Sequence, residues 1–143
     1  MVLKNMVFVV LAILMVGSTY AQTVIGTWKM VDDKNGKERC VVKIYEKNDK
    51  VYGRIVELLD PEKQNAICSE CDDYREGEKV EGMVVIENME KQGDSYTGGK
   101  ILNPDSGSLY RCKLWLDKND TNKLYVRGYL AFFYRTQTWY RLN

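Results

Sequence analysis

We expect an all-β protein, an antiparallel, eight-stranded, up-and-down barrel. Eight short runs alternate apolar and polar residues, and turns rich in Gly, Asn, Asp and Ser separate them. No helical spacing of apolar residues continues beyond about ten residues. Short strands at intervals of roughly 10 to 15 residues, joined mostly by tight turns, are typical of a sheet that closes on itself, because closure removes exposed edges. A flatter two-sheet sandwich is the structural alternative.

The expected strands follow one another along the chain. They cover residues 24–31, 39–46, 51–59, 83–89, 95–102, 109–116, 123–131 and 134–142. In the second, Cys40, Val42 and Ile44 share one face, which is the two-residue period of a half-buried strand. The Asn35-Gly36 pair before it supplies the positive φ angles of a tight hairpin.

Two later strands carry further signals. Gly98 and Gly99 are adjacent inside the fifth strand, and such pairs often mark a bulge or bend in a curved sheet. In the seventh strand Leu124 and Val126 lie on one face, and Arg127 lies on the other. If the aliphatic face is the core, Arg127 points outward.

The amino-acid composition excludes several classes of function. The chain has 143 residues, with 21 basic and 20 acidic side chains and no histidine. This length allows one domain. The balanced charge gives no electrostatic reason to expect nucleic-acid binding. Without histidine, Ser-His-Asp and Cys-His nucleophiles and His-ligated metals are excluded. We therefore expect no catalytic residues, no metal and no cofactor, with an enzyme only as a third possibility.

The first 21 residues resemble a secretory signal. Lys4 precedes the apolar run 6–17, and Thr19 and Ala21 stand where signal peptidase reads small residues. A run of about 12 residues is short for a membrane-spanning helix, so a retained anchor is the less favoured alternative. We expect a cleaved signal peptide at residues 1–21, a single β-barrel domain at residues 22–143, no membrane span in the mature chain, and a periplasmic or extracellular location.

Export changes the interpretation of the cysteines, because thiols outside the cytoplasm tend to be oxidised. Cys40, Cys68, Cys71 and Cys112 are therefore disulfide candidates, with three possible connectivities. A local Cys68–Cys71 bridge or two bridges from loop to barrel are favoured over redox catalysis or a four-cysteine zinc site. Cys40 and Cys112 fall on expected inward faces, so a pair of buried free thiols is also consistent with the pattern.

The segment 60–81 is the main charge asymmetry. It holds eight acidic and three basic side chains, whereas the rest of the chain after residue 21 is basic by the same margin. A lid over the barrel mouth and a calcium-binding loop are the functional interpretations. A solvated loop is the favoured one.

Several motifs occur in one order along the chain. They are Gly26-Thr27-Trp28, Gly53-Arg54-Ile55-Val56, Gly82-Met83, Gly98-Gly99-Lys100-Ile101, Pro104-Asp105-Ser106-Gly107, Tyr110, Val126-Arg127-Gly128-Tyr129 and Arg135-Thr136-Gln137-Thr138-Trp139. Together they resemble an uncharacterised bacterial exported family, domain of unknown function 2147. The Gly-x-Trp near the start and Arg141 in the last strand also resemble the lipocalin-like, or calycin, plan. In that plan the tryptophan closes the barrel floor against the arginine. The resemblance implies a small exported β-barrel and no settled activity.

The candidate ligand-binding residues are arginines and aromatics of the strands. They are Trp28, Arg54, Tyr110, Arg127, Tyr129, Arg135 and Trp139. An inward arginine could hold a carboxylate or phosphate bidentately while aromatic rings line the remaining space. The alternative is that the arginine stems lie over the barrel surface.

The leading functional hypothesis is an exported barrel that binds a small apolar or lipid-like ligand, because eight strands are just wide enough to hold one. The alternative is an envelope structural or interaction protein with a filled core and no small-molecule ligand. We expect no nucleic-acid partner, and the sequence names no protein partner.

Overall fold

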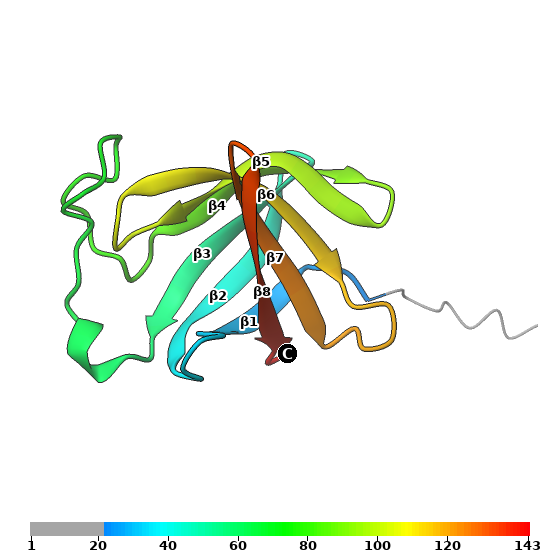
Figure 1. The fold of residues 1–143 in the computed structure, drawn as a ribbon, viewed down its shortest axis with the longest axis horizontal. Coiled ribbons are helices and arrows are strands. Elements are labelled where there is room, and N and C mark those ends of the chain that lie inside the picture. The colour runs from blue at the N-terminus through cyan, green and yellow to red at the C-terminus, as the bar shows by residue number, and fades with distance from the viewer. Residues whose placement is uncertain (1–21) are drawn as a thin grey trace, which may run out of the picture.

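The computed structural model describes residues 22–143, and these form one closed barrel (Figure 1). The expected signal peptide at residues 1–21 lies outside the described residues. The strands are β1 (Gly26–Val31), β2 (Glu38–Lys47), β3 (Lys50–Leu58), β4 (Val84–Gln92), β5 (Ser95–Asn103), β6 (Ser108–Leu116), β7 (Lys123–Leu130) and β8 (Phe133–Arg141). A short 3-10 helix, η1 (Pro61–Lys63), follows β3.

Each strand pairs antiparallel with the next, and β1 pairs with β8 through Trp28 and Arg141 to close the ring. The up-and-down barrel predicted from the alternating pattern is confirmed, and the sandwich alternative is excluded. All eight expected strands form, with boundaries within two residues except at the end of β4, which continues to Gln92.

Local signals in the sequence have the expected structural effects only in part. Gly36 has a φ of 71°, but Asn35 has no positive φ and residues 32–37 separate β1 from β2, so the tight hairpin predicted at Asn35-Gly36 is wrong. The two-residue hairpin lies between β2 and β3, where Asn48 and Asp49 both adopt positive φ. Gly98 has a φ of 80°, and the β5–β6 register shifts between Tyr96 and Gly99, so the predicted bulge is present. A Cβ at Gly99 would collide with the β4 backbone, so only glycine fits at this position.

The inward faces meet in one apolar core. Cys40, Val42 and Ile44 of β2 are all buried, as are Leu124 and Val126 of β7. Fully buried side chains such as Trp28, Ile44 and Leu124 lie toward the end where the β2–β3, β4–β5 and β6–β7 turns meet. The β1–β2, β5–β6 and β7–β8 turns and the long segment 59–83 surround the other end, which we call the open end.

Candidate functional site: the open end of the barrel

The closed end is sealed by an indole and a guanidinium. Trp28 is fully buried, and its Nε1 donates to the carbonyl of Val24 at 2.9 Å. The guanidinium of Arg141 lies 4.2 Å from the centre of the Trp28 ring. It also donates hydrogen bonds to backbone carbonyls of Thr23, Ile25 and Thr121. These contacts tie the segment before β1, the end of β8 and the β6–β7 loop together at this end of the barrel.

The open end leads into a cavity of about 510 Å³. This volume falls within the roughly 300–1,000 Å³ of typical small-molecule sites. Most of the lining is apolar and comes from different strands, including Met30, Cys40, Ile55, Leu102, Val126 and Leu130. The long segment adds Ala66 and Val80. The space is therefore an apolar chamber inside the barrel, bounded on one side by the long segment.

The deeper wall contains one glycine and few polar groups. A Cβ at Gly128 would lie 3.4 Å from the Cβ of Tyr110 and 3.7 Å from Ile101, so these two side chains pack over the β7 backbone there. Gln137 also lines the chamber, and its Oε1 accepts from Nε1 of the buried Trp139 at 3.2 Å. This part of the lining suits an apolar group, because its polar groups are few and none of them is charged.

Charged side chains gather at the rim and neutralise one another. Arg39 binds Asp32 at 2.9 Å and lies 3.5 Å from Asp60. The backbone N–H of Lys34 and the Arg39 guanidinium hold the pKa of Asp32 below its usual value. Two further pairs complete the rim, Lys63 with Asp105 at 2.8 Å and Arg135 with Asp33. The three cations thus face four carboxylates, and each cation already has an anionic partner.

The acidic segment is anchored to the barrel by Arg75. This arginine is only 3% exposed and is the one buried charged side chain of residues 22–143. Its Nη2 binds Asp73 at 2.6 Å, its Nη1 donates to the carbonyl of Val84 at 2.9 Å, and Glu87 lies 3.5 Å away. Hydrogen bonding from Arg75 lowers the pKa of Asp73. Most acidic side chains of the segment are exposed, as in a solvated loop, but the segment is also anchored, because β4 supplies acceptors for the buried Arg75.

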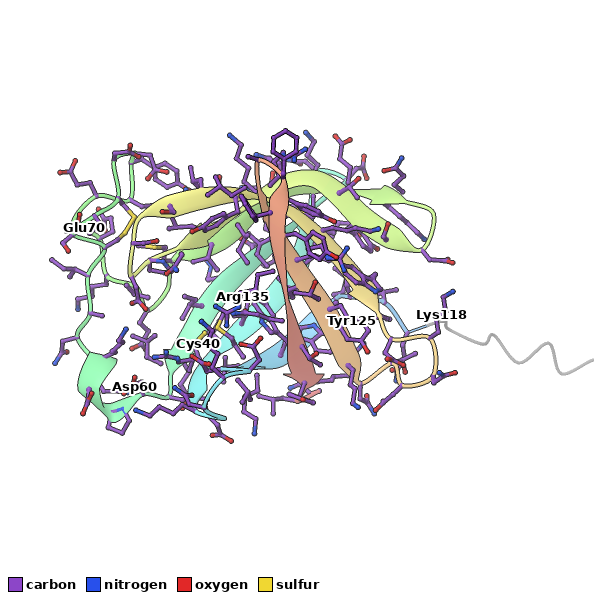
Figure 2. The ribbon with its side chains drawn as sticks, in the orientation of Figure 1. Cys40, Asp60, Glu70, Lys118, Tyr125 and Arg135 are labelled. Atoms are coloured by element: carbon purple, nitrogen blue, oxygen red, sulfur yellow. A yellow bond between two sulfur atoms is a disulfide. The ribbon has the colours of Figure 1, made fainter. Side chains whose placement is uncertain are left out.

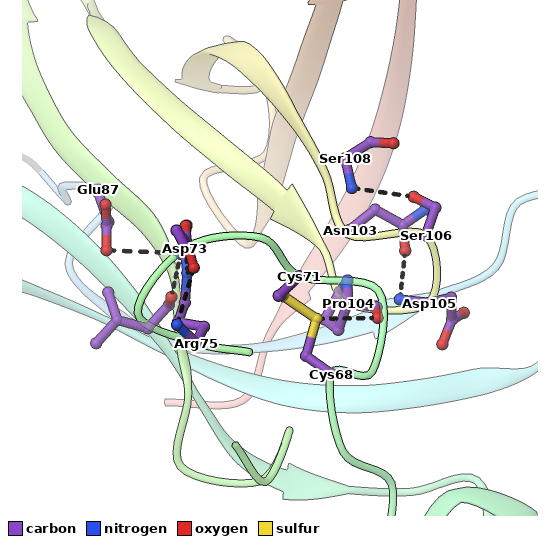
Figure 3. The surroundings of a disulfide bond; sticks show 11 residues. Cys68, Cys71, Asp73, Arg75, Glu87, Asn103, Pro104, Asp105, Ser106 and Ser108 are labelled. Atoms are coloured by element: carbon purple, nitrogen blue, oxygen red, sulfur yellow. Dashed lines mark hydrogen bonds and ion pairs between the residues drawn. A yellow bond between two sulfur atoms is a disulfide. The ribbon is translucent and has the colours of Figure 1, made fainter. Parts of the chain in front are cut away.

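The same segment contains a disulfide and contacts the β5–β6 turn (Figure 3). Cys68 and Cys71 are bonded, with Cα atoms 5.4 Å apart, which confirms the local bridge. Cys68 Sγ lies 3.4 Å from the Pro104 carbonyl oxygen. Any side chain at Gly107, whose φ is 71°, would collide with the backbone of Glu70. The segment and the turn therefore form one continuous side of the cavity mouth.

The two remaining cysteines are free and buried, Cys40 on β2 and Cys112 on β6. Burial raises the pKa of each thiol to about 12. Cys40 lines the cavity, with its Sγ 3.9 Å from Met30 Sδ. The bridge between Cys68 and Cys71 excludes the zinc site built from all four thiolates. Within residues 22–143, no group of three or more His, Cys, Asp or Glu side chains is placed to hold a metal ion.

The candidate ligand-binding residues do not form one site. Tyr110 and Arg135 line the cavity, and Figure 2 labels Arg135 and Cys40, which both contribute to it. Trp28 and Trp139 are fully buried in the core. Arg54 is exposed, and its Nη1 donates to the Gly82 carbonyl in a groove between β3 and the long segment.

Arg127 and Tyr129 lie on the outer face, as the alternation of β7 predicts. The guanidinium of Arg127 lies 4.2 Å from the Tyr134 ring centre and 4.9 Å from that of Trp115. Its Nε donates to Thr136 at 2.7 Å. The outside of β6–β8 is thus a surface of stacked aromatic and basic side chains.

Sequence reasoning missed most of the rim. Asp32, Arg39, Asp60 and Lys63 lie in or beside turns, where charged residues are ordinary, and only the folded barrel brings them to one mouth. The apolar pair Phe132-Phe133 was a detectable signal, because two phenylalanines are unusual in a hairpin turn.

Comparison with known proteins places the chain in a family. The profile of a family described as an uncharacterized protein conserved in bacteria (DUF2147) matches residues 26–141. The chain belongs to this family. The resemblance found in the sequence motifs is therefore confirmed, and the family description names no activity.

A solved structure supports the fold assignment. A protein from the human pathogen Helicobacter pylori, described as belonging to the lipocalin family, superposes with a TM-score of 0.72 at 20% sequence identity. The similarity covers 86% of this chain and 85% of that one. The DUF2147 barrel is thus lipocalin-like.

No significant match was found among curated proteins. In residues 22–143, no helix is long and apolar enough to cross a membrane.

Proposed function

We propose that this DUF2147 protein is exported and binds one small, largely apolar or lipid-like molecule in the open-end cavity. The observation that carries the proposal is the apolar chamber of about 510 Å³ inside the barrel. A largely apolar cavity that is open at one end and carries a few polar groups is the usual form of a small-molecule site. A lipocalin-like fold permits this function without requiring it, so the proposal rests on the chamber and its rim.

The rim suggests which head group such a molecule carries. A carboxylate would have to displace an aspartate from Arg39, Lys63 or Arg135, and the rim already holds one more acid than base. Removing an anion from a paired arginine loses a charge-assisted hydrogen bond. An uncharged or zwitterionic head group avoids that exchange and can still bond to the paired side chains. The ligand class is therefore an apolar chain or ring system with a neutral polar end.

The structural alternative, a scaffold with a filled core, is less well supported. A filled barrel would pack its inward side chains to the density of a protein interior and leave few voids larger than a water molecule. The observed cavity of about 510 Å³ is open at its mouth and extends inward between side chains such as Ile55, Leu102 and Val126. The chamber therefore favours ligand binding over a purely structural role.

Export rests on the sequence of residues 1–21 and is consistent with the disulfide. A bridge between Cys68 and Cys71 is favoured outside the reducing cytoplasm. N-terminal sequencing of the protein from its own host tests this part of the proposal. A mature chain beginning at Gln22 supports it, and an intact Met1 in the cytoplasmic fraction would contradict it.

Native mass spectrometry of the chain from residue 22 tests binding. The probes are palmitic acid and 1-monopalmitoylglycerol, which share a chain and differ in head-group charge. We expect one bound molecule per protein, with the neutral glyceride retained at least as well as the acid. Trp28 and Trp139 lie in the core beneath the cavity, so their emission should change on binding. The proposal is wrong if neither probe gives a bound species and the tryptophan emission does not change.

A further inference from the structure

The β7–β8 turn exposes an unusual concentration of apolar side chains. We call Leu130, Phe132, Phe133 and Tyr134 the β7–β8 tip; their exposed fractions are 61, 99, 79 and 62%. Ala131 adopts a φ of 53°, which lets the chain reverse at once and leaves Phe132 at the apex. Nothing in residues 22–143 covers the Phe132 ring. A large ring held out in water at a hairpin apex is an interaction surface rather than part of the core.

The tip adjoins the cavity mouth. Leu130, Phe133 and Tyr134 belong to the cavity lining, whereas Phe132 does not. The apolar surface of the tip therefore continues into the apolar chamber. A surface bound by the tip would lie directly against the entrance of the cavity.

Cations without an anionic partner flank the tip on its outer side. Arg127 stacks 4.2 Å from the Tyr134 ring, and Arg111 stacks 5.6 Å from the Tyr129 ring. Neither arginine takes part in any ion pair of the described chain. The three cations of the rim, by contrast, each have an anionic partner. An anionic surface that meets the tip would find guanidinium groups free to bind phosphate.

We propose that the β7–β8 tip docks the barrel onto a lipid bilayer surface. The rings of Phe132 and Phe133 would enter the boundary between head groups and acyl chains, and Arg111 and Arg127 would contact lipid phosphates. Aromatic side chains beside arginines suit this boundary, because one part is apolar and the other is wet and anionic. The docked cavity would open toward the bilayer. This last consequence rests on the proposed ligand function; the docking itself does not.

The size of the tip favours a bilayer over a second protein. A stable protein interface buries about 800 Å² on each partner. An aromatic side chain buries only about 150–250 Å², and part of Phe133 and Tyr134 is already covered. The three aromatic rings of the tip offer about 450–750 Å² before that cover is subtracted, which is less than one side of a stable dimer interface. Shallow insertion into a bilayer needs no matching surface.

The test is vesicle co-sedimentation of the chain from residue 22, which contains all eight strands. Vesicles of phosphatidylcholine alone are compared with vesicles containing 30 mol% phosphatidylglycerol. The variant Phe132→Ser removes the apical ring without touching the cavity lining, and Phe132→Trp keeps a large aromatic ring there. Ile67→Ser is the matched control, because Ile67 is 52% exposed on the long segment.

We expect the wild type and the Ile67→Ser control to partition onto the anionic vesicles, and Phe132→Ser to lose about tenfold or more in partition coefficient. Phe132→Trp should bind, with emission shifted to the blue and quenched by brominated lipid. Replacing Arg111 and Arg127 by Gln should weaken binding to anionic vesicles more than binding to neutral ones.

Three outcomes would overturn the docking proposal. They are wild-type protein that does not partition, Phe132→Ser that partitions as well as wild type, and sedimentation velocity showing that Phe132→Ser converts a dimer into a monomer. A ligand titration without vesicles separates the two proposals. Vesicle binding without ligand binding contradicts only the ligand function, and ligand binding without vesicle binding contradicts only the docking.

Discussion

Among single residues, Arg141 makes the most connections at the closed end. It stacks on Trp28 and donates to carbonyls from the N-terminal segment and the β6–β7 loop. Arg141→Met should lower the free energy of unfolding by about 2 kcal/mol, since it removes a cation–π contact and several charge-assisted hydrogen bonds. Urea unfolding measures this. The control Lys118→Met, at an exposed loop position, should change stability by less than about 0.5 kcal/mol; equal effects would contradict the assigned role of Arg141.

The free thiols give a second prediction at this scale. Because burial raises the pKa of Cys40 and Cys112 to about 12, both remain protonated thiols at pH 8 and react poorly with a disulfide reagent. We expect no fast reaction in the native protein and two thiols released on unfolding. Cys40 should react before Cys112, because only Cys40 lines the cavity, and a bound apolar ligand should slow it. Rapid reaction of Cys112 in the native protein would contradict this packing.

Residue-level prediction from sequence succeeded where alternation applies. The inward positions Cys40, Val42 and Ile44 and the outward Arg127 follow from a period of two. Arg75 could not be found in this way, because nothing local distinguishes it from the other charges of an acidic loop. Its burial depends on Val84 and Glu87 of β4, and only the folded chain brings these together.

Among the elements, the strands were predictable and the long segment was not. Strand boundaries follow from turn chemistry and alternation, both of which are local. The segment 59–83 has no period, yet it contains the Ile67–Lys79 bridge, a disulfide and a buried arginine. Its order comes from contacts with β4 and the β5–β6 turn, which no local pattern encodes.

Loss of the disulfide should loosen this segment and leave the barrel intact. The bridge spans three residues, so the chain-entropy model gives a contribution of about 2 kcal/mol or less. In Cys68→Ser/Cys71→Ser, hydrogen exchange should accelerate for amides bonded within the segment, such as those of Cys68 and Gly77. The paired amides of β6 and β7 should exchange as in the wild type. Equal acceleration in the strands would show that the segment and the barrel unfold as one unit.

For the whole molecule, the two ends of the barrel differ in construction. The closed end holds the fully buried Trp28 and its contact with Arg141, whereas the open end, where we propose binding, combines the chamber, the paired rim and the β7–β8 tip. Sequence alone predicted the barrel and the closing role of Trp28 and Arg141. It did not predict the chamber, because the volume left inside a barrel depends on how inward side chains from eight strands fill it.

The most direct test of ligand binding uses a variant that fills the chamber. Gly128→Val adds an isopropyl group to the cavity lining against Tyr110 and Ile101, which must shift into the chamber, and Gly128 has no positive φ that would strain a larger residue. Thr138→Val, on the outer face of β8, is the matched control. The measurement is fluorescence titration of the chain from residue 22 with the neutral apolar probe N-phenyl-1-naphthylamine.

We predict saturable binding of one probe molecule to the wild type and to Thr138→Val. Gly128→Val should bind at least about tenfold more weakly, which corresponds to about 1.4 kcal/mol, and circular dichroism checks that the variant is folded. No saturable binding to the wild type, or equal affinity in a folded Gly128→Val, would contradict the claim that the barrel interior is the ligand site.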